Sequence, residues 1–200
     1  TILAVLSLHL IGCSTDQKVL TIAGIPDQNA SQLTRRYIVL TDYLEEQLGI
    51  KVRYLPTIDY AATVLAFTQG DVQLAWFGGL SGVQARLAVP GSEAIAQRER
   101  DRHFHTKFIA NRKVDVRSIE DLKGLKFAFG NESSTSGHLI PRHVLLRTGV
   151  NPETYFDGPP VFSGSHDKTY IMVESGTVHA GALSEIVWQE AVGSGRVDTA

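Results

Sequence analysis

Apolar residues in this chain form short runs that alternate with longer stretches of mixed polar and apolar positions. The short, mainly apolar runs predict buried strands at 19–23, 52–55, 72–77, 108–110, 126–129, 161–162 and 178–183. Between them, three- and four-residue spacings and capping residues predict helices at 31–48, 59–69, 81–88, 118–123, 135–147 and 167–174. Because strands and helices alternate, we expect an α/β fold with parallel strands and right-handed crossovers.

Three of the predicted helices carry signals for their ends or their buried faces. Ser31 is expected to cap the first helix, Gly49 to end it, and Ser118 to cap the short helix at 118–123. The inward face of the first helix is predicted to consist of Leu33, Tyr37, Leu40, Leu44 and Leu48. In the helix that starts near Asp59, the predicted inward residues are Ala62, Leu65 and Ala66.

Composition narrows the classes of protein to which the chain can belong. Its 200 residues are 43% hydrophobic, and 19 Lys and Arg against 21 Asp and Glu give a formal net charge of −2. The hydrophobic content excludes a disordered chain, and the balanced charge argues against nucleic-acid binding through phosphate contacts. No apolar run reaches the roughly 18 residues of a membrane-spanning helix. A single cysteine excludes an intrachain disulfide and a cysteine-rich zinc site, and no cofactor is predicted.

A polar, charged segment at 98–107 separates two α/β units. We expect a first lobe over 14–106 and a second lobe over 107–200. Within the segment, His103 and His105 allow a metal site to be imagined, but two histidines at this spacing on a loop are weak ligands. A surface loop is the favoured interpretation, and no metal is predicted.

The first thirteen residues, 1–13, are typical of part of a signal peptide rather than of the fold. They end in Leu10-Ile11-Gly12-Cys13, which resembles the lipobox of bacterial lipoproteins, and a polar stretch follows at once. Cys13 is therefore the predicted site of lipid attachment. The alternative is a buried first strand with an incidental cysteine.

The segment most informative about chemistry is the turn at 130–137, where a strand runs into a helix through glycine, serine and threonine. The first amides of a helix lack internal partners and lie at the positive end of its dipole, which suits an anion. The hydroxyl groups of Ser134, Thr135 and Ser136 would add neutral donors around an oxyanion. A plain run of N-capping residues is the alternative. Pro141 removes the helical donor to the carbonyl oxygen of Gly137, which predicts a bend.

A second candidate site follows the strand at 161–162, in Ser163-Gly164-Ser165-His166-Asp167. His166 would donate a hydrogen bond to an oxyanion, and Asp167 would cap the helix and orient the imidazole ring. A surface histidine is one alternative. A serine hydrolase that uses Ser165 or Ser134 with His166 is the other, although the nucleophile-elbow pattern is missing.

Two aromatic residues at the carboxyl ends of strands complete the candidate site. Tyr60 offers a hydroxyl donor and the wall of a pocket, and Phe77 precedes two glycines that let the backbone approach a ligand. Ordinary packing is the alternative for both. Ligands in open α/β sheets bind at the carboxyl ends of strands, so the candidates together predict a cleft between two lobes.

These motifs resemble the solute-binding lipoproteins of phosphate, phosphite and phosphonate ABC importers, over nearly the whole chain after residue 18. The residues that carry the resemblance are Ile25-Pro26-Asp27, Asp59-Tyr60-Ala61, Ala75-Trp76-Phe77-Gly78, Ser134-Thr135-Ser136-Gly137, Ser163-Gly164-Ser165-His166-Asp167 and Ala180-Gly181-Ala182. The fuller sequence around them is most similar to the branch of selenate or phosphonate-like transporters. The resemblance implies a two-lobed periplasmic-binding-protein fold of type II that closes on an oxyanion.

The resemblance also assigns roles to individual residues. It implies that Ser134, Thr135 and Ser136 grip the anion together with Tyr60 and His166. A second aromatic contact falls at Phe104, and Glu185 lies near the place of a carboxylate that would hold an amine. Because Phe104 lacks a hydroxyl and Glu185 does not fully match the place of the carboxylate, a small inorganic oxyanion is favoured over an aminophosphonate.

The function predicted from the sequence is capture of a small tetrahedral oxyanion, such as selenate, phosphonate, phosphite or phosphate, and its delivery to an ABC permease and ATPase. Such a protein is not an enzyme, and it lies in the periplasm or on the outer face of the cytoplasmic membrane, held by a lipid anchor. A sensor module of a regulator is a further alternative. The resemblance also leads us to expect that the return part of the first lobe lies beyond residue 200.

Overall fold

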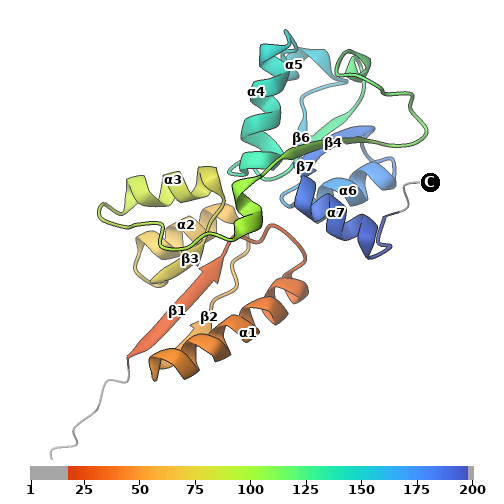
Figure 1. Ribbon diagram of the computed structural model, residues 1–200. Coiled ribbons are helices and arrows are strands. Elements are labelled where there is room, and N and C mark those ends of the chain that lie inside the picture. Colours follow the sequence, from red (N-terminus) through yellow and green to blue (C-terminus); the bar gives the residue numbers. More distant parts are fainter. Residues whose placement is uncertain (1–17, 198–200) are drawn as a thin grey trace, which may run out of the picture.

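The computed structural model describes residues 18–197, which form two groups of strands and helices joined by a long crossing segment (Figure 1). Cys13 and the predicted leader lie outside the described residues. Between residues 18 and 197, no helix combines the length and the apolar character needed to cross a membrane.

The first lobe contains a three-stranded parallel sheet with the strand order β2-β1-β3. Its elements in chain order are β1 (Val19–Gly24), α1 (Ala30–Leu48), β2 (Lys51–Tyr54), α2 (Tyr60–Thr68), β3 (Leu74–Trp76) and α3 (Gly79–Ala88). The central strand is the best buried, with Ile22 and Ala23 each 1% exposed. This confirms the predicted alternation of parallel strands and helices in this half of the chain.

The start of α1 differs from the prediction by two residues. Asn29 is the cap, because its side-chain oxygen accepts hydrogen bonds from the N–H groups of Ser31 and Gln32 at 3.0 and 3.3 Å. Asparagine caps as well as serine does and comes first along the chain. The end of the helix is as predicted: Gly49 adopts a φ of +65° and donates to the carbonyl of Glu45.

The predicted inward faces of the first two helices are wrong at one leucine each. Leu48 and Leu65 are 51% and 55% exposed. In α2 the buried residues are Tyr60 and Thr63 instead. Thr63 tolerates burial because its hydroxyl is hydrogen-bonded to the hydroxyl of Thr57, so the apolar stripe is not the face that packs.

The second lobe contains a four-stranded sheet with the order β4-β7-β5-β6. Its elements are β4 (Thr106–Ala110), η2 (Glu120–Leu122), β5 (Phe127–Phe129), η3 (Thr135–Leu139), α4 (Ile140–Arg147), α5 (Pro152–Tyr155), β6 (Val161–Phe162), α6 (His166–Glu174), β7 (Ala180–Ser184) and α7 (Glu185–Gly193). The strand β5 is parallel to both neighbours, but β4 is antiparallel to β7, which corrects the expectation of parallel strands throughout. The exception arises because β4 enters from the other lobe and not through a helical crossover.

Ser118 does not cap a helix as predicted. The carboxylate of Asp121 instead accepts hydrogen bonds from the backbone N–H groups of Arg117 and Ser118 and from the hydroxyl of Ser118. The Asp121 carboxylate and not the Ser118 hydroxyl therefore takes the backbone N–H groups at this point, and only the 3₁₀ turn η2 follows.

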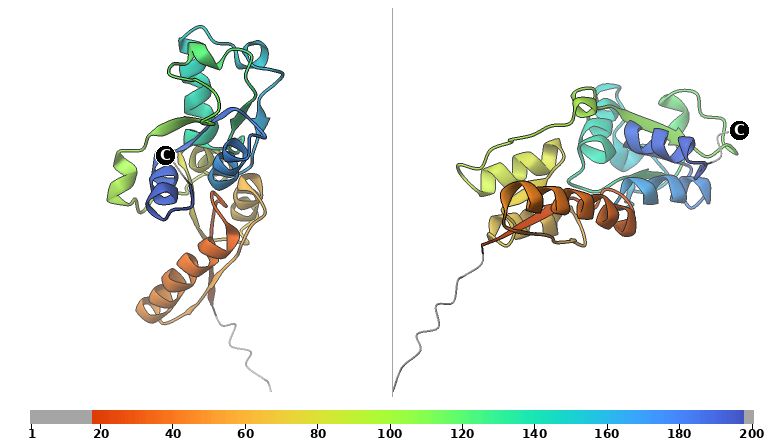
Figure 2. Two further views of the ribbon diagram at one scale, coloured as in Figure 1. Left: turned by 90° about the vertical axis from the view of Figure 1, so that its right-hand side faces the viewer. Right: turned by 60° about the horizontal axis from the view of Figure 1, so that its bottom comes forward.

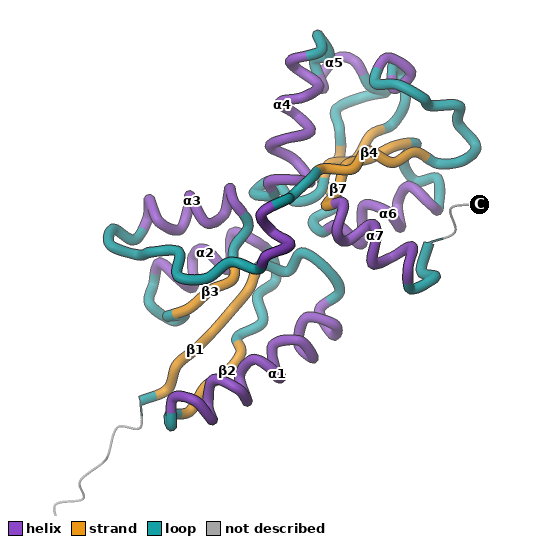
Figure 3. The backbone as a smooth tube through the Cα atoms, in the orientation of Figure 1, coloured by secondary structure: helices purple, strands orange, loops and turns teal. Residues whose placement is uncertain are grey.

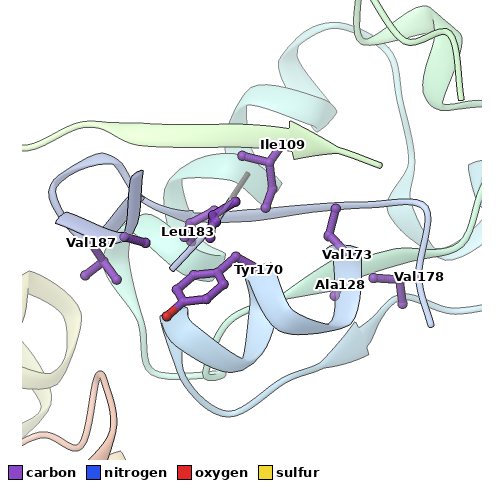
Figure 4. Close-up of a cluster of buried hydrophobic side chains, with 9 residues drawn as sticks. Ile109, Ala128, Tyr170, Val173, Val178, Leu183 and Val187 are labelled. Atoms are coloured by element: carbon purple, nitrogen blue, oxygen red, sulfur yellow. The ribbon is translucent and has the colours of Figure 1, made fainter. Parts of the chain in front are cut away.

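Two clusters of buried side chains stabilise the second lobe. In β5, Ala128 belongs to a cluster with residues of α6 and α7, whereas Phe127 and Phe129 belong to a cluster with Leu145 of α4. Because successive residues of a strand face opposite sides, α6 and α7 cover one face of the sheet and α4 covers the other. Figure 4 shows the first cluster, where Tyr170 of α6 lies beneath the sheet.

The two lobes touch at several points. The crossing segment, residues 89–105, contains the short helix η1 (Glu99–Arg102) and is the visible chain connection between the lobes (Figures 2 and 3). Away from it, the N–H of His166 in the second lobe donates to the carbonyl of Asp27 in the first at 2.9 Å. The N–H of Leu80, after β3, donates to the hydroxyl oxygen of Thr135, after β5, at 2.8 Å. The segments that follow β1, β3, β5 and β6 therefore meet between the lobes, as the candidate site requires.

Candidate functional site

The turn at 130–137, which follows β5, is closed by a backbone hydrogen bond. The N–H of Gly130 donates to the carbonyl oxygen of Gly137 at 2.8 Å. In a regular α-helix that oxygen would accept from residue 141, but Pro141 has no N–H to donate. The chain accordingly starts as the π-helical η3 before it continues as α4, where the sequence predicted one α-helix over 135–147.

A side chain at either end of this hydrogen bond would be crowded, because a Cβ on Gly130 would lie 3.2 Å from the Cα of Gly137. A Cβ atom on Gly137 would lie 3.1 Å from the Cα of Gly130, 3.0 Å from the Oγ of Ser134 and 3.1 Å from the Cε1 of His166. These are shorter than ordinary van der Waals contacts, and the first involves a backbone atom. The close approach brings the imidazole of His166, at the start of α6, against the turn.

Two of the three predicted hydroxyl groups in the turn organise the protein. The Oγ of Ser134 accepts a hydrogen bond from the N–H of Gly137 at 3.0 Å, as an N-cap does. The Oγ1 of Thr135 accepts from the N–H of Leu80, in the first turn of α3, at 2.8 Å. Thr135 therefore links the two lobes. A hydroxyl that accepts one hydrogen bond keeps its own proton, so both groups remain able to donate.

The hydroxyl groups of Ser136 and Tyr60 are buried. The Ser136 hydroxyl has no hydrogen-bond partner in the described part of the chain. The Tyr60 hydroxyl forms no hydrogen bond of good geometry there, although the side chain of Ser134 lies close enough to oppose slightly the rise in the pKa of Tyr60 that burial causes. Each residue is 1% exposed. An orphaned buried hydroxyl costs about 1–3 kcal/mol, and such groups are rare in folded proteins. Burial, reinforced by the charge of Asp27, raises the pKa of Tyr60, which keeps its hydroxyl a proton donor. The backbone of Ser136 is held in place by Thr106, whose hydroxyl donates to the Ser136 carbonyl at 2.9 Å.

His166 is held as a neutral ring with a defined tautomer. Its Nδ1 accepts a hydrogen bond from the N–H of Ser184 at 3.3 Å, so the proton of the neutral imidazole lies on Nε2. Complete burial lowers the pKa of His166 to about 4, although the charge of Asp167 acts in the opposite direction. The predicted role of His166 as a hydrogen-bond donor is therefore available at neutral pH without a positive charge.

The geometry around Ser165 and Asp167 gives the serine hydrolase alternative no support. The hydroxyl of Ser165 donates to the carboxylate of Asp167 and not to an imidazole. Ser134 accepts from a backbone amide, and the Nδ1 of His166 is occupied by Ser184. Neither serine is therefore hydrogen-bonded to the imidazole that would serve as its base. Asp167 is buried beside the site but does not orient the ring of His166 as predicted, because the backbone of β7 does so.

Sequence reasoning missed a third orphaned group, the side-chain oxygen of Gln28. Gln28 is 7% exposed, and its Oε1 has no hydrogen-bond partner among the described residues. It directly follows Asp27, whose carbonyl accepts from His166. The available signal was its place just after the carboxyl end of β1, directly after the motif Ile25-Pro26-Asp27.

Asp27 adds an unusual carboxyl group to this region. Burial raises its pKa to about 6, against the opposing charges of Arg98 and Arg36. Arg98 lies in the crossing segment, 5.0 Å from the ring centre of Trp76, and forms two hydrogen bonds to Asp101. The segment that connects the lobes is thus electrostatically coupled to the end of β1.

The aromatic candidates Phe77 and Phe104 differ in their surroundings. Phe77 follows β3, is half-buried and packs edge-to-face on Phe67 with ring centres 5.6 Å apart. Phe104 is 41% exposed and has no ring contact with a residue in the range 18–197. The carboxylate of Glu185 lies 3.2 Å from the Nδ1 of His105. Throughout that range, no three His, Cys, Asp or Glu side chains are grouped as metal ligands would be.

Comparison with known proteins shows the family to which the chain is similar. Residues 22–200 match the family described as "ABC transporter, phosphonate, periplasmic substrate-binding protein". The chain is 44% identical over 181 residues to a probable ABC transporter phosphite-binding protein, PhnD1, of Prochlorococcus marinus, covering 88% of this chain and 61% of that protein. It is 30% identical over 174 residues to the phosphate-import protein PhnD of Mycolicibacterium smegmatis, covering 82% of this chain and 54% of that protein.

A solved structure supports the same similarity at the level of the fold. The structure of Prochlorococcus marinus PhnD1 in complex with methylphosphonate superposes with a TM-score of 0.85 at 44% identity, covering 88% of this chain and 66% of that one. The predicted periplasmic-binding-protein fold of type II is thereby confirmed. The chain spans 54–61% of the length of these two curated relatives.

Proposed function

Because the chain belongs to the family of periplasmic substrate-binding proteins of phosphonate ABC transporters, we propose that it binds a small phosphorus oxyanion of the phosphonate and phosphite type. The 44% identity to a probable phosphite-binding protein, and the methylphosphonate bound in that relative's structure, support this class of ligand. The ligand would lie where the 130–137 turn, Tyr60 and His166 meet.

The observation that carries the proposal is the pair of orphaned hydroxyl groups on Tyr60 and Ser136. Two hydrogen-bond donors, each on a residue 1% exposed, are satisfied when an anion supplies the acceptors. Their elements come from different lobes, so an anion between them would bridge the lobes. Binding of the anion would therefore favour the arrangement in which the two lobes are closed around it over one in which they are apart.

The donors in the proposed site are neutral. Ser134, Thr135, Ser136 and Tyr60 offer hydroxyl groups, and His166 offers an Nε2–H without charge. Backbone N–H groups at the start of η3 add the positive end of the helix dipole. Neutral donors stabilise an anion through directional hydrogen bonds. The proposed site would therefore discriminate between anions by their shape and by the number of protons they carry.

Gln28 gives the proposed site an acceptor as well. The Oε1 of Gln28 is buried without a donor, and an anion that carries a proton would supply one. A phosphonate or phosphite monoanion has a P–OH group, whereas sulfate and selenate are fully deprotonated at neutral pH. The buried acceptor therefore favours phosphorus oxyanions over sulfate and over the selenate that the sequence resemblance suggested.

The role of the protein would be delivery of the anion to an ABC permease and its ATPase outside the cytoplasm, and not catalysis. The family description, which names a periplasmic substrate-binding component, supports this location and these partners. Attachment to the membrane would be through lipid on Cys13, which we propose on the basis of the lipobox resemblance alone. The tether would keep the binding protein near its permease.

Titration calorimetry with methylphosphonate, phosphite, phosphate, sulfate and selenate tests the proposed function. We expect saturable binding of methylphosphonate or phosphite at 1:1 stoichiometry and weaker or no binding of sulfate and selenate. The absence of binding to all three phosphorus anions would overturn the proposal. Tighter binding of selenate or sulfate than of any phosphorus anion would overturn its ligand class.

A further inference from the structure

His138 connects the 130–137 turn to the helix that follows it. The Nδ1 atom of His138 lies 2.7 Å from the carbonyl oxygen of Glu132, six residues earlier in the chain. The Nε2 atom accepts a hydrogen bond of 2.9 Å from the Nε of Arg142, one helical turn later. The imidazole therefore contacts the polypeptide on both sides of the turn.

These two partners determine the protonation of the ring. A carbonyl oxygen only accepts, so Nδ1 must donate its proton to Glu132. A guanidinium N–H only donates, so the Nε2 of His138 must be unprotonated. The network therefore uses the neutral imidazole with its proton on Nδ1, the opposite tautomer to that of His166.

Arg142 and two aromatic rings fix the orientation of the imidazole. Arg142 also forms an ion pair of 2.8 Å with Glu153, the second residue of α5. The ring of His138 packs edge-to-face on Phe129 and on Phe162, with ring centres 5.1 and 4.8 Å apart. The imidazole is thus held by the ends of β5 and β6 as well as by α4 and α5.

The bond to Glu132 adds a contact in the middle of the first half of the turn, between Gly130 and Ser134. Two hydrogen bonds already join Ser134 to the helix, from the N–H groups of Gly137 and Leu139, each at 3.0 Å. At the start of the turn, the N–H of Gly130 donates to the carbonyl oxygen of Gly137 at 2.8 Å. Between Gly130 and Ser134, the bond to the Glu132 carbonyl from His138 ties the chain directly to the helix within the described residues. Ser136, with its orphaned hydroxyl, lies in the sequence between Glu132 and His138, the two residues that this bond joins.

We infer that His138 is a positioning residue for anion binding: through its Nδ1–H bond to the Glu132 carbonyl, it holds the 130–137 turn in the geometry that presents Ser136 to the ligand. It does not contact the anion. The inference rests on the proposed function for its effect on affinity, but its effect on the turn is independent of any ligand.

The test uses two amides that imitate different halves of the imidazole. In His138→Asn, the side-chain NH₂ group can donate from the position of Nδ1 to Glu132. In His138→Gln, the longer side chain brings its oxygen to the position of Nε2, where it can accept from Arg142 but not hold Glu132. His138→Leu removes both bonds, and His143→Leu, at an exposed histidine on the same helix, is the matched control.

Affinity for methylphosphonate and phosphite is measured by calorimetry, and hydrogen exchange of the Gly137 and Leu139 amides is measured without ligand. We expect His138→Asn and His143→Leu to bind within about threefold of the wild type, and His138→Gln and His138→Leu to bind about tenfold more weakly. The two weakened variants should also exchange these amides about tenfold faster.

Equal affinity and equal exchange in His138→Asn and His138→Gln would overturn the inference, because Glu132 would then not be the partner that matters. Weaker binding in His138→Gln without faster exchange would also overturn it, since the ring would act on the ligand and not on the turn. If the wild type binds neither anion, the proposed function fails, and the exchange comparison alone decides the positioning role.

Discussion

The N–H of Gly130 and the carbonyl oxygen of Gly137 are 2.8 Å apart across the turn that opens the π-helical segment η3. The bond exists because Pro141 cannot use that carbonyl, and it requires two residues without side chains at the crossing point. The ring of His166 lies against Gly137 at this crossing, and Ser136 is the residue directly before Gly137. The candidate site is therefore built around this backbone crossing.

Alanine at Gly137 tests whether the crossing is required. The new Cβ would lie 3.0–3.1 Å from three atoms, one of them in the backbone of Gly130, so these neighbours must move by a few tenths of an ångström. We expect Gly137→Ala to lower the free energy of unfolding by about 1–3 kcal/mol and to abolish anion binding. Gly193→Ala is the control, because its Cβ would meet no atom within 4 Å and alanine favours the helix α7. Equal effects of the two substitutions in denaturant unfolding would count against the crossing.

Removal of the orphaned hydroxyl groups should affect stability and binding in opposite directions. Tyr60→Phe and Ser136→Ala each delete a buried donor without a partner. In the ligand-free protein we expect unchanged stability or a gain of up to about 1 kcal/mol, since an uncompensated desolvation cost disappears. Methylphosphonate should bind at least about tenfold more weakly to either variant. A loss of stability in both variants, with affinity unchanged, would mean that the hydroxyl groups have hidden partners within the protein.

Much of the fold could be predicted because its signals are local. The helix stop at Gly49 and the freed carbonyl opposite Pro141 follow from the backbone chemistry of single residues. The strand β6 at 161–162 was also located correctly. The buried face of α2 could not be predicted, because burial of Thr63 depends on a partner hydroxyl on Thr57 and not on hydrophobicity.

The candidate site was predictable as a set of residues but not as a set of roles. Ser134, Thr135 and Ser136 looked equivalent in the sequence, yet the first caps η3, the second bonds to Leu80 in the other lobe, and the third has no partner. These differences arise from contacts between elements far apart in the chain. Gln28 was missed for the same reason, since burial alone distinguishes it from an ordinary loop residue.

The pH dependence of stability should reveal two groups with opposite effects. The pKa of His166 falls from 6.5 to about 4 in the folded protein, so its contribution is complete above pH 6.5 and is lost as the pH falls toward 4. The pKa of Asp27 rises from 3.8 to about 6, so the folded state gains stability as the pH falls from 6 toward 4. Each pKa unit corresponds to about 1.4 kcal/mol, and the two contributions largely cancel over this range.

Single substitutions should unmask each contribution. Relative to the wild type, Asp27→Asn should lose stability more steeply between pH 6 and pH 4, and His166→Asn should lose it less steeply or gain it. Denaturant unfolding at pH 6.5, 5.5 and 4.5 measures the slopes. Three parallel profiles would show that neither group changes its protonation on folding in this range.

Glu190 of α7 should contribute modestly to the contact between the lobes. Its carboxylate pairs at 3.0 Å with Arg36 of α1 and with Arg100 of the crossing segment. Although partial burial acts against it, the hydrogen bonds from the two arginines hold the pKa of Glu190 below its ordinary value. Glu190→Gln should cost about 0.5–1 kcal/mol of stability at low salt and less in 0.5 M NaCl, because exposed ion pairs are screened. A salt-independent loss would point to packing instead of charge.

A crystal structure of the protein grown with methylphosphonate is the most direct test of the site. The phosphonate oxygens should lie within about 3 Å of the Oγ of Ser136 and the Oη of Tyr60, with the Nε2 of His166 as a further donor. A ligand bound elsewhere, or a site in which both hydroxyl groups stay without partners, would contradict the assignment of these residues to anion binding.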